Sequence, residues 1–88
     1  MILDEVFELL NAAGRAPNHA VFSTDYLGRS PRYYDYLRCS GTRPSLETLM
    51  RVIMRLSEIA HETSEDLDAT EEGRMARRIM RRVYMRCQ

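Results

Sequence analysis

The chain has 88 residues, 44 % hydrophobic and 30 % charged, and its 13 basic residues, all arginine, balance 13 acidic ones. This composition excludes a disordered chain and allows one small domain with four or five short helices around a single core. No apolar run approaches the roughly 18 residues of a membrane span. Residues 1–5 lack the basic and apolar regions of a signal peptide, so we expect a cytoplasmic protein without membrane contact.

The first predicted helix covers residues 2–13, where acids separate apolar residues at helical spacing. Gly14 and the following Pro17 end it. Asn18 is placed to cap a second helix over residues 19–27. The inward residues expected for that helix are Val21, Phe22 and Leu27.

A third helix is predicted to follow Gly28, because glycine readily adopts the left-handed conformation of a tight turn. Ser30 is expected as its N-cap. Pro31 is expected at the first helical position, where a missing N–H group costs nothing. This helix runs to about Cys39.

After a loop over residues 40–44, Ser45 is predicted to cap a fourth helix that is apolar on two faces. Its main stripe is Leu46, Leu49, Met50, Ile53 and Leu56, with Val52 and Ile59 lying off it. The acidic residues 61–68 either extend this helix or form a connection. Asp68 or Thr70 caps a last helix. No segment predicts a strand, so the expected fold is all-α.

Charge divides the second half of the chain into two blocks. Residues 57–73 hold seven acids and no arginine, whereas residues 74–88 hold six arginines and no acid. The arginines either pair with the acidic block, within or between subunits, or contact DNA, an anionic membrane or an acidic partner. The complete preference for arginine over lysine reflects either a GC-rich genome or recognition of phosphate and guanine edges.

Residues 22–30, followed by residues 33–38, form a helix, a glycine turn, a serine cap and a second helix. This stretch resembles the repressor-type helix-turn-helix family named after the phage Cro and CI proteins. Residues 41–49, with the pattern G-x-x-P-S-x-x-x-L, resemble that family's closing loop and fourth helix. The L-G-R-S core at residues 27–30 is also similar to small bacterial helix-turn-helix-like proteins. The interval from Phe22 to Gly28 is one residue longer than is usual there, which predicts a shifted register for the second helix.

The resemblance implies that Tyr34 and Leu37 are buried while the opposite face of the third helix enters a major groove. In this reading Arg32 pairs with a guanine edge, and the loop residue Arg43 contacts the DNA backbone. The candidate DNA-binding residues are Ser30, Pro31, Arg32, Tyr33, Tyr36, Arg29 and Arg43.

These features predict a helix-turn-helix domain over residues 1–60, an acidic connection over 61–69, and an arginine-rich helix over 70–88 that packs on the core or on a partner subunit. The favoured function is a sequence-specific DNA-binding transcriptional regulator, a small bacterial or phage-type repressor. We expect a homodimer whose surface comes from the last helix and part of the fourth.

The alternative is a small protein-binding adaptor or antiactivator that keeps the fold without binding DNA. Zero net charge and the tyrosines at positions 26, 33 and 36 favour it, because exposed tyrosines beside arginines are typical of protein-binding surfaces.

Catalysis has little support in the sequence. His19 and His61 are isolated, and there is no glycine-rich phosphate loop, so we expect no enzyme, no metal site and no cofactor. Cys39 and Cys87 are expected to be free thiols in a reducing compartment.

Overall fold

The structure is a computed structural model that describes residues 1–63, 66 and 69–87. In this part of the chain every regular element is a helix, which confirms the predicted all-α class. The elements are α1 (Ile2–Ala12), α2 (His19–Val21), the π-helical turn η1 (Phe22–Tyr26), α3 (Tyr33–Ser40), α4 (Leu46–Thr63) and α5 (Glu71–Cys87). None of the helices in these ranges is long and apolar enough to cross a membrane.

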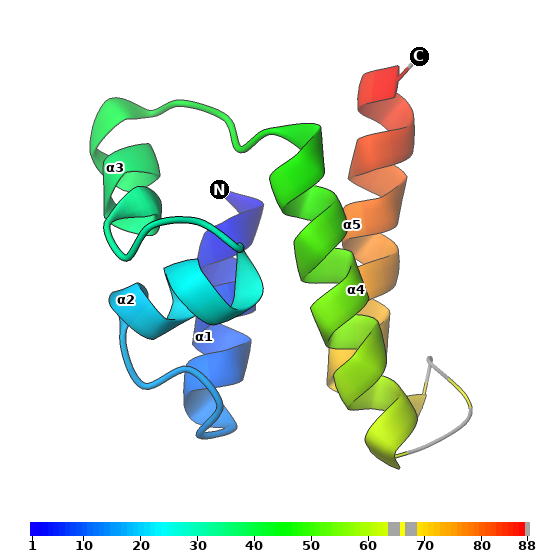
Figure 1. Cartoon of the computed structure of the whole chain (residues 1–88). Coiled ribbons are helices and arrows are strands. Elements are labelled where there is room, and N and C mark those ends of the chain that lie inside the picture. Colours follow the sequence, from blue (N-terminus) through cyan, green and yellow to red (C-terminus); the bar gives the residue numbers. More distant parts are fainter. Residues whose placement is uncertain (64–65, 67–68, 88) are drawn as a thin grey trace.

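Two groups of helices make up the molecule (Figure 1). One group holds α1, α2, η1 and α3. The other is the antiparallel pair of α4 and α5, which has the most extensive helix–helix contact in the described chain. The groups meet where α1 contacts α5 and where η1 contacts α4. The loop that follows α3 runs across to the start of α4, at the end of the α4–α5 pair where α5 finishes (Figure 1).

Three helix starts follow the side-chain caps that the sequence predicts. The Asn18 side chain accepts a hydrogen bond from the Val21 N–H at 2.9 Å, at the start of α2. Ser45 accepts one from the Thr48 N–H at 3.2 Å, and Thr70 accepts one from the Gly73 N–H at 3.0 Å. The alternative cap Asp68 lies outside the described residues. These caps are local chemistry, since each pairs a side chain with an N–H three residues later.

The second predicted helix widens into η1 after one α-helical turn. The Leu27 N–H donates to the Phe22 carbonyl at 3.2 Å, a bond that spans five residues instead of four. The wide turn buries Phe22, Ser23, Tyr26 and Leu27 together. The long interval between Phe22 and Gly28 falls on this turn. Of the expected inward residues Phe22 and Leu27 are confirmed, whereas Val21 is only half-buried.

Aromatic rings from three elements form the core of the first group. Phe22 meets Tyr34 of α3 edge-on with centroids 4.9 Å apart, and it meets Phe7 of α1 at 5.4 Å. Phe22 and Tyr34 are among the largest fully buried side chains, and Leu37 lies beside them in the same core. The expectation that Tyr34 and Leu37 face inward is therefore confirmed.

The predicted start of the third helix is wrong by two residues. The Ser30 carbonyl accepts the Tyr33 N–H at 3.0 Å in a turn, and α3 begins at Tyr33 with no side-chain cap from its N-cap residue Arg32. The cap comes from η1 instead, because the buried Ser23 hydroxyl accepts the Tyr34 N–H at 3.0 Å. The start of α3 is therefore capped by a residue of another element and not by Ser30, the cap that the local sequence predicts.

Replacing Ser23 by alanine is expected to lower the free energy of unfolding by about 1–3 kcal/mol, because the buried Tyr34 N–H loses its acceptor. Denaturant unfolding followed by circular dichroism measures this change. The matched control is Thr24→Ala, which removes an exposed hydroxyl bonded to nearby carbonyls and should cost no more than about 0.5 kcal/mol. Equal losses in the two variants would contradict the role given to Ser23.

The buried face of α4 differs in part from the predicted stripe. Leu49, Ile53 and Leu56 are buried as expected, but Leu46 and Met50 are exposed. Val52 and Ile59, predicted off the stripe, are buried, and α4 packs against both η1 and α5. Packing in two directions is therefore confirmed, with the buried face rotated away from Leu46 and Met50.

Candidate nucleic-acid interface

The outer face of α3 is open. Arg32, Asp35, Tyr36 and Cys39 line a shallow hollow on it, and Tyr36 is 59 % exposed. Asp35 also bonds His19 of α2, with 2.6 Å between its carboxylate and the ring Nδ1. Charge in the hollow is therefore balanced between one arginine and one carboxylate. Cys39 is an exposed free thiol, whereas the Cys87 side chain lies outside the described residues.

Of the three tyrosines expected at the surface, one is largely exposed. Tyr26 is buried, with its hydroxyl 3.4 Å from the Arg15 carbonyl that accepts from it. Tyr33 is half-buried against the core, and its hydroxyl shares a 3.3 Å hydrogen bond with Thr48. The exposed tyrosine is Tyr36. The expectation of an exposed tyrosine cluster is wrong, because η1 turns Tyr26 inward and α4 contacts Tyr33.

Arg29 ties the turn before α3 to the start of α4. Its guanidinium donates to the hydroxyls of Thr48 and Ser45, each at 3.2 Å, and lies 3.9 Å from the Glu47 carboxylate. It also stacks over the Tyr33 ring, 5.5 Å from the centroid. Arg29 and Tyr33 are thus held in place by α4. Ser30 and Pro31, between them in the chain, are exposed.

A second cleft lies at the C-terminal end of α3. It has a volume of about 720 Å³ and opens between the start of α1, the loop after α3 and the last two turns of α5. Five arginines line it: Arg38, Arg43, Arg81, Arg82 and Arg86. Its lining also includes the buried apolar residues Leu37 and Leu49. Asp4 is the one acid among its described lining residues.

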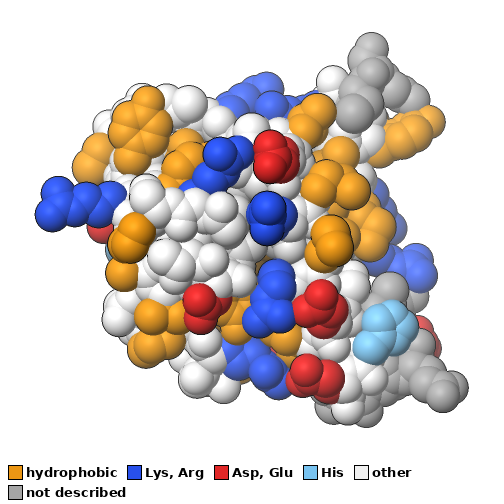
Figure 2. Space-filling view, in the orientation of Figure 1, with side chains coloured by type: hydrophobic (Ala, Val, Ile, Leu, Met, Phe, Trp, Pro, Cys, Tyr) orange, Lys and Arg blue, Asp and Glu red, His pale blue; other side chains and the backbone are white. Residues whose placement is uncertain are grey.

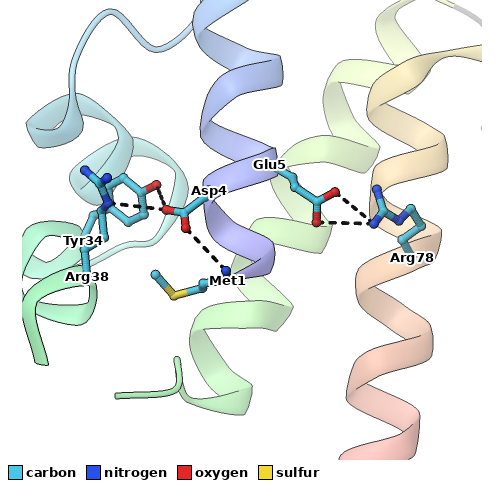
Figure 3. A network of polar contacts seen from close by, with 6 residues as sticks. All are labelled: Met1, Asp4, Glu5, Tyr34, Arg38 and Arg78. Atoms are coloured by element: carbon cyan, nitrogen blue, oxygen red, sulfur yellow. Dashed lines mark hydrogen bonds and ion pairs between the residues drawn. The ribbon is translucent and has the colours of Figure 1, made fainter. Parts of the chain in front are cut away.

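The Asp4 carboxylate is already occupied by neighbouring groups (Figure 3). It accepts a hydrogen bond from the Tyr34 hydroxyl and lies 3.6 Å from the Arg38 guanidinium and 3.4 Å from the Met1 amino group. Burial by itself would raise the pKa of Asp4, but these partners outweigh it and lower the pKa. Burial, aided by the bond to Asp4, raises the pKa of the Tyr34 phenol well above its usual value. Asp4 is therefore ionised and neutralised at neutral pH, which leaves the other arginines as the dominant charge of the cleft.

Two arginines of α5 are anchored to the rest of the fold. Arg78 donates to the Glu5 carboxylate of α1 at 3.1 Å (Figure 3), and Arg86 donates to the Pro44 carbonyl at 2.8 Å. Both partners lie outside residues 57–73, so the contacts that hold these two arginines within the chain are not with the acidic block. Helix packing places α5 beside α1 and the loop after α3. The acids at 65 and 68 lie outside the described residues.

Five of the seven predicted DNA-binding residues fall at three places, and Ser30 and Pro31 lie exposed in the turn before α3. Arg32 and Tyr36 line the hollow on α3, Arg29 and Tyr33 contact α4, and Arg43 lines the arginine cleft. Sequence reasoning did not include the other cleft arginines in the site. The arginine-rich last helix was visible in the sequence, but nothing local showed that its final turns meet Arg38 and Arg43.

The geometry defines the protein as a small all-α protein with an open face on α3 and an arginine-lined cleft. Residues 3–88 match the model of a family of unknown function, DUF6626, and the chain belongs to that family. No curated protein and no solved structure matches the sequence. In the described residues no three His, Cys, Asp or Glu side chains come together as metal ligands would.

Proposed function

We propose that this protein is a DNA-binding regulator of the helix-turn-helix type, similar to the Cro and CI repressors, in which α3 lies against the duplex. The observation that carries the proposal is the arginine cleft. Five arginines line it together with a single carboxylate, Asp4, which Arg38 already accompanies at 3.6 Å, and the cleft lies beside the end of α3. Arginine binds phosphate oxygens in a fork geometry, and phosphate contacts supply most of the affinity of such proteins.

In this proposal the outer face of α3 and its C-terminal end have different roles. The hollow along the outer face presents Arg32 and Tyr36 to base edges in the major groove. The cleft at the C-terminal end, with Arg43 and the arginines of α5, holds the phosphate backbone. Arg29 and Tyr33 act indirectly by fixing the turn before α3 against α4.

Two single substitutions are expected to separate these roles. Arg32→Ala should relax sequence preference, measured by selection from a randomised duplex pool, at a cost of about 1–3 kcal/mol on the preferred site. Arg43→Ala should weaken binding to all duplexes about equally and reduce the salt slope by about 1. Arg15→Ala, an exposed arginine outside the cleft, is the control and should change neither. Absence of DNA affinity at low salt in the unmodified protein would refute the proposal.

Binding of a protein partner through α3 is the second candidate. The observation that favours it is the balanced charge of the hollow, where Arg32 and Asp35 flank the exposed Tyr36. Tyrosine and arginine are enriched at the centres of protein interfaces. A partner retained after nuclease treatment and lost in Tyr36→Ala, but kept in Arg43→Ala, would support this function over DNA binding.

A further inference from the structure

We propose that the arginine cleft binds a small organic polyphosphate, a nucleotide whose phosphates contact the arginines and whose base packs on the apolar lining. Binding of the nucleotide does not depend on DNA binding. One consequence does rest on the proposed function. Because the same arginines hold the DNA backbone there, nucleotide and duplex exclude each other from the cleft.

The cleft holds more positive charge than its own residues neutralise. Among its described lining residues five arginines face one carboxylate, and Arg38 lies 3.6 Å from that carboxylate, Asp4. Arg43, Arg81 and Arg82 make no hydrogen bond or ion pair within the residues that the structure describes. A cleft lined by charges of one sign concentrates counter-ions, and several ionised phosphate oxygens are the groups that pair best with several guanidinium groups.

Several arginines outside the cleft have acidic partners. Arg55 lies 2.7 Å from the Glu58 carboxylate, and Arg78 lies 3.1 Å from that of Glu5. Figure 2 shows one face of the molecule on which acidic side chains are interspersed with arginines. In the cleft, by contrast, arginines from α3, the following loop and α5 share a single carboxylate. Their mutual repulsion is relieved by a bound anion.

The cleft also has the size and lining of a small-molecule site. Its volume of about 720 Å³ lies within the range of roughly 300–1,000 Å³ that is typical of such sites. The buried Leu37 and Leu49 and the exposed Met85 add apolar surface to its lining. Arg86 donates to the Pro44 carbonyl at 2.8 Å, which ties the last turn of α5 to the loop after α3. Two walls of the cleft are therefore held together before any ligand binds.

Charge and lining together favour a nucleotide over simpler anions. A fatty acid carries one charge, too few for three arginines without partners. Inorganic polyphosphate carries enough charge but has no group to cover the apolar lining. The bases of a duplex are stacked inside it, so DNA phosphates also leave that lining in water. A nucleoside triphosphate supplies several charges and a base whose free face packs on apolar side chains.

Isothermal titration calorimetry of the full chain with ATP, in the absence of DNA, tests the binding. Tripolyphosphate and adenosine each lack one half of the ligand and should bind about 10-fold more weakly than ATP or worse. Arg82→Ala removes a charge-assisted hydrogen bond and should weaken ATP binding about 10-fold or more. Arg15→Ala, at an exposed arginine outside the cleft, should leave it unchanged.

A methionine pair tests the apolar contact separately. Met85→Ser should weaken ATP binding about 3-fold or more and leave tripolyphosphate binding unchanged, because only ATP brings an apolar group to the cleft. Met54→Ser, at an exposed methionine of α4 outside the cleft, is the control. Absence of ATP binding, or Arg82→Ala binding as tightly as the unmodified protein, would overturn the proposal. Equal affinities for ATP and tripolyphosphate would overturn the role of the base.

Fluorescence anisotropy of a labelled duplex at constant ionic strength measures the exclusion. ATP should displace the duplex at concentrations near its calorimetric Kd, whereas adenosine should not. A duplex that stays bound at saturating ATP would show that the two ligands do not share the cleft, against the inference. ATP binding by a protein without DNA affinity would refute the DNA proposal alone, and DNA binding without ATP binding would refute the nucleotide proposal alone.

Discussion

Phe22→Ala is expected to lower the free energy of unfolding by about 3–5 kcal/mol. Phe22 is completely buried, and its ring contacts Phe7 of α1 and Tyr34 of α3. Truncation leaves a cavity where three elements meet. The loss is a large fraction of the roughly 5–15 kcal/mol by which small domains are stable.

Chemical denaturation followed by far-ultraviolet circular dichroism measures the loss. Phe22→Leu keeps most of the volume and should cost no more than about 1.5 kcal/mol, which separates the cavity from other effects of the substitution. Val21→Ala, a smaller truncation of the half-buried neighbour, should cost less than Phe22→Ala. A Phe22→Ala variant as stable as Phe22→Leu would show that the aromatic cluster does not hold these elements together.

The double variant Arg43→Ala/Arg82→Ala is expected to weaken DNA binding on the order of 60-fold at about 0.1 M salt. Both arginines line the cleft, and within the part of the chain that the structure describes neither makes a hydrogen bond or ion pair. If each contacts one phosphate, their removal reduces the slope of log K against log salt by about 1.8. Stability should change little, because both side chains are exposed.

Fluorescence anisotropy at several salt concentrations gives both the affinity and the slope. The matched control is Arg43→Lys/Arg82→Lys, which keeps both charges and should keep most of the slope, with a smaller loss of affinity because lysine lacks the guanidinium fork. If the alanine and lysine variants have the same slope as the unmodified protein, the cleft does not contact DNA phosphates. A loss confined to one duplex sequence would instead point to base contacts by these arginines.

Local signals in the sequence predicted the helices well. Asn18, Ser45 and Thr70 cap their helices through atoms three residues away, so both partners of each bond lie within one short stretch of sequence. Gly28 and Gly41 take positive φ angles at the ends of their helical segments, as short-range sterics allow for glycine. The apolar spacing of α1 likewise predicted its buried face.

Contacts between distant residues decided the rest. The start of α3 moved from Pro31 to Tyr33 because a hydroxyl eleven residues before Tyr34 caps it. Tyr26 was expected at the surface but is buried, since η1 turns it toward the core. Met50 was expected to be buried but is exposed, because α4 is rotated so that its buried face packs against both η1 and α5. Each of these three features depends on contacts with residues more than one helical turn away in the sequence.

The candidate site shows the same division. Arg32 and Tyr36 could be placed on the open face of one helix from sequence alone, because helical spacing relates residues that are close in the chain. The cleft joins Arg43 with Arg82 across about forty residues, through the packing of α5 against α4 and α1. Sequence by itself determined which segments are helical and where most of them begin. Only the tertiary structure decided which arginines lie together, because that depends on how whole helices pack.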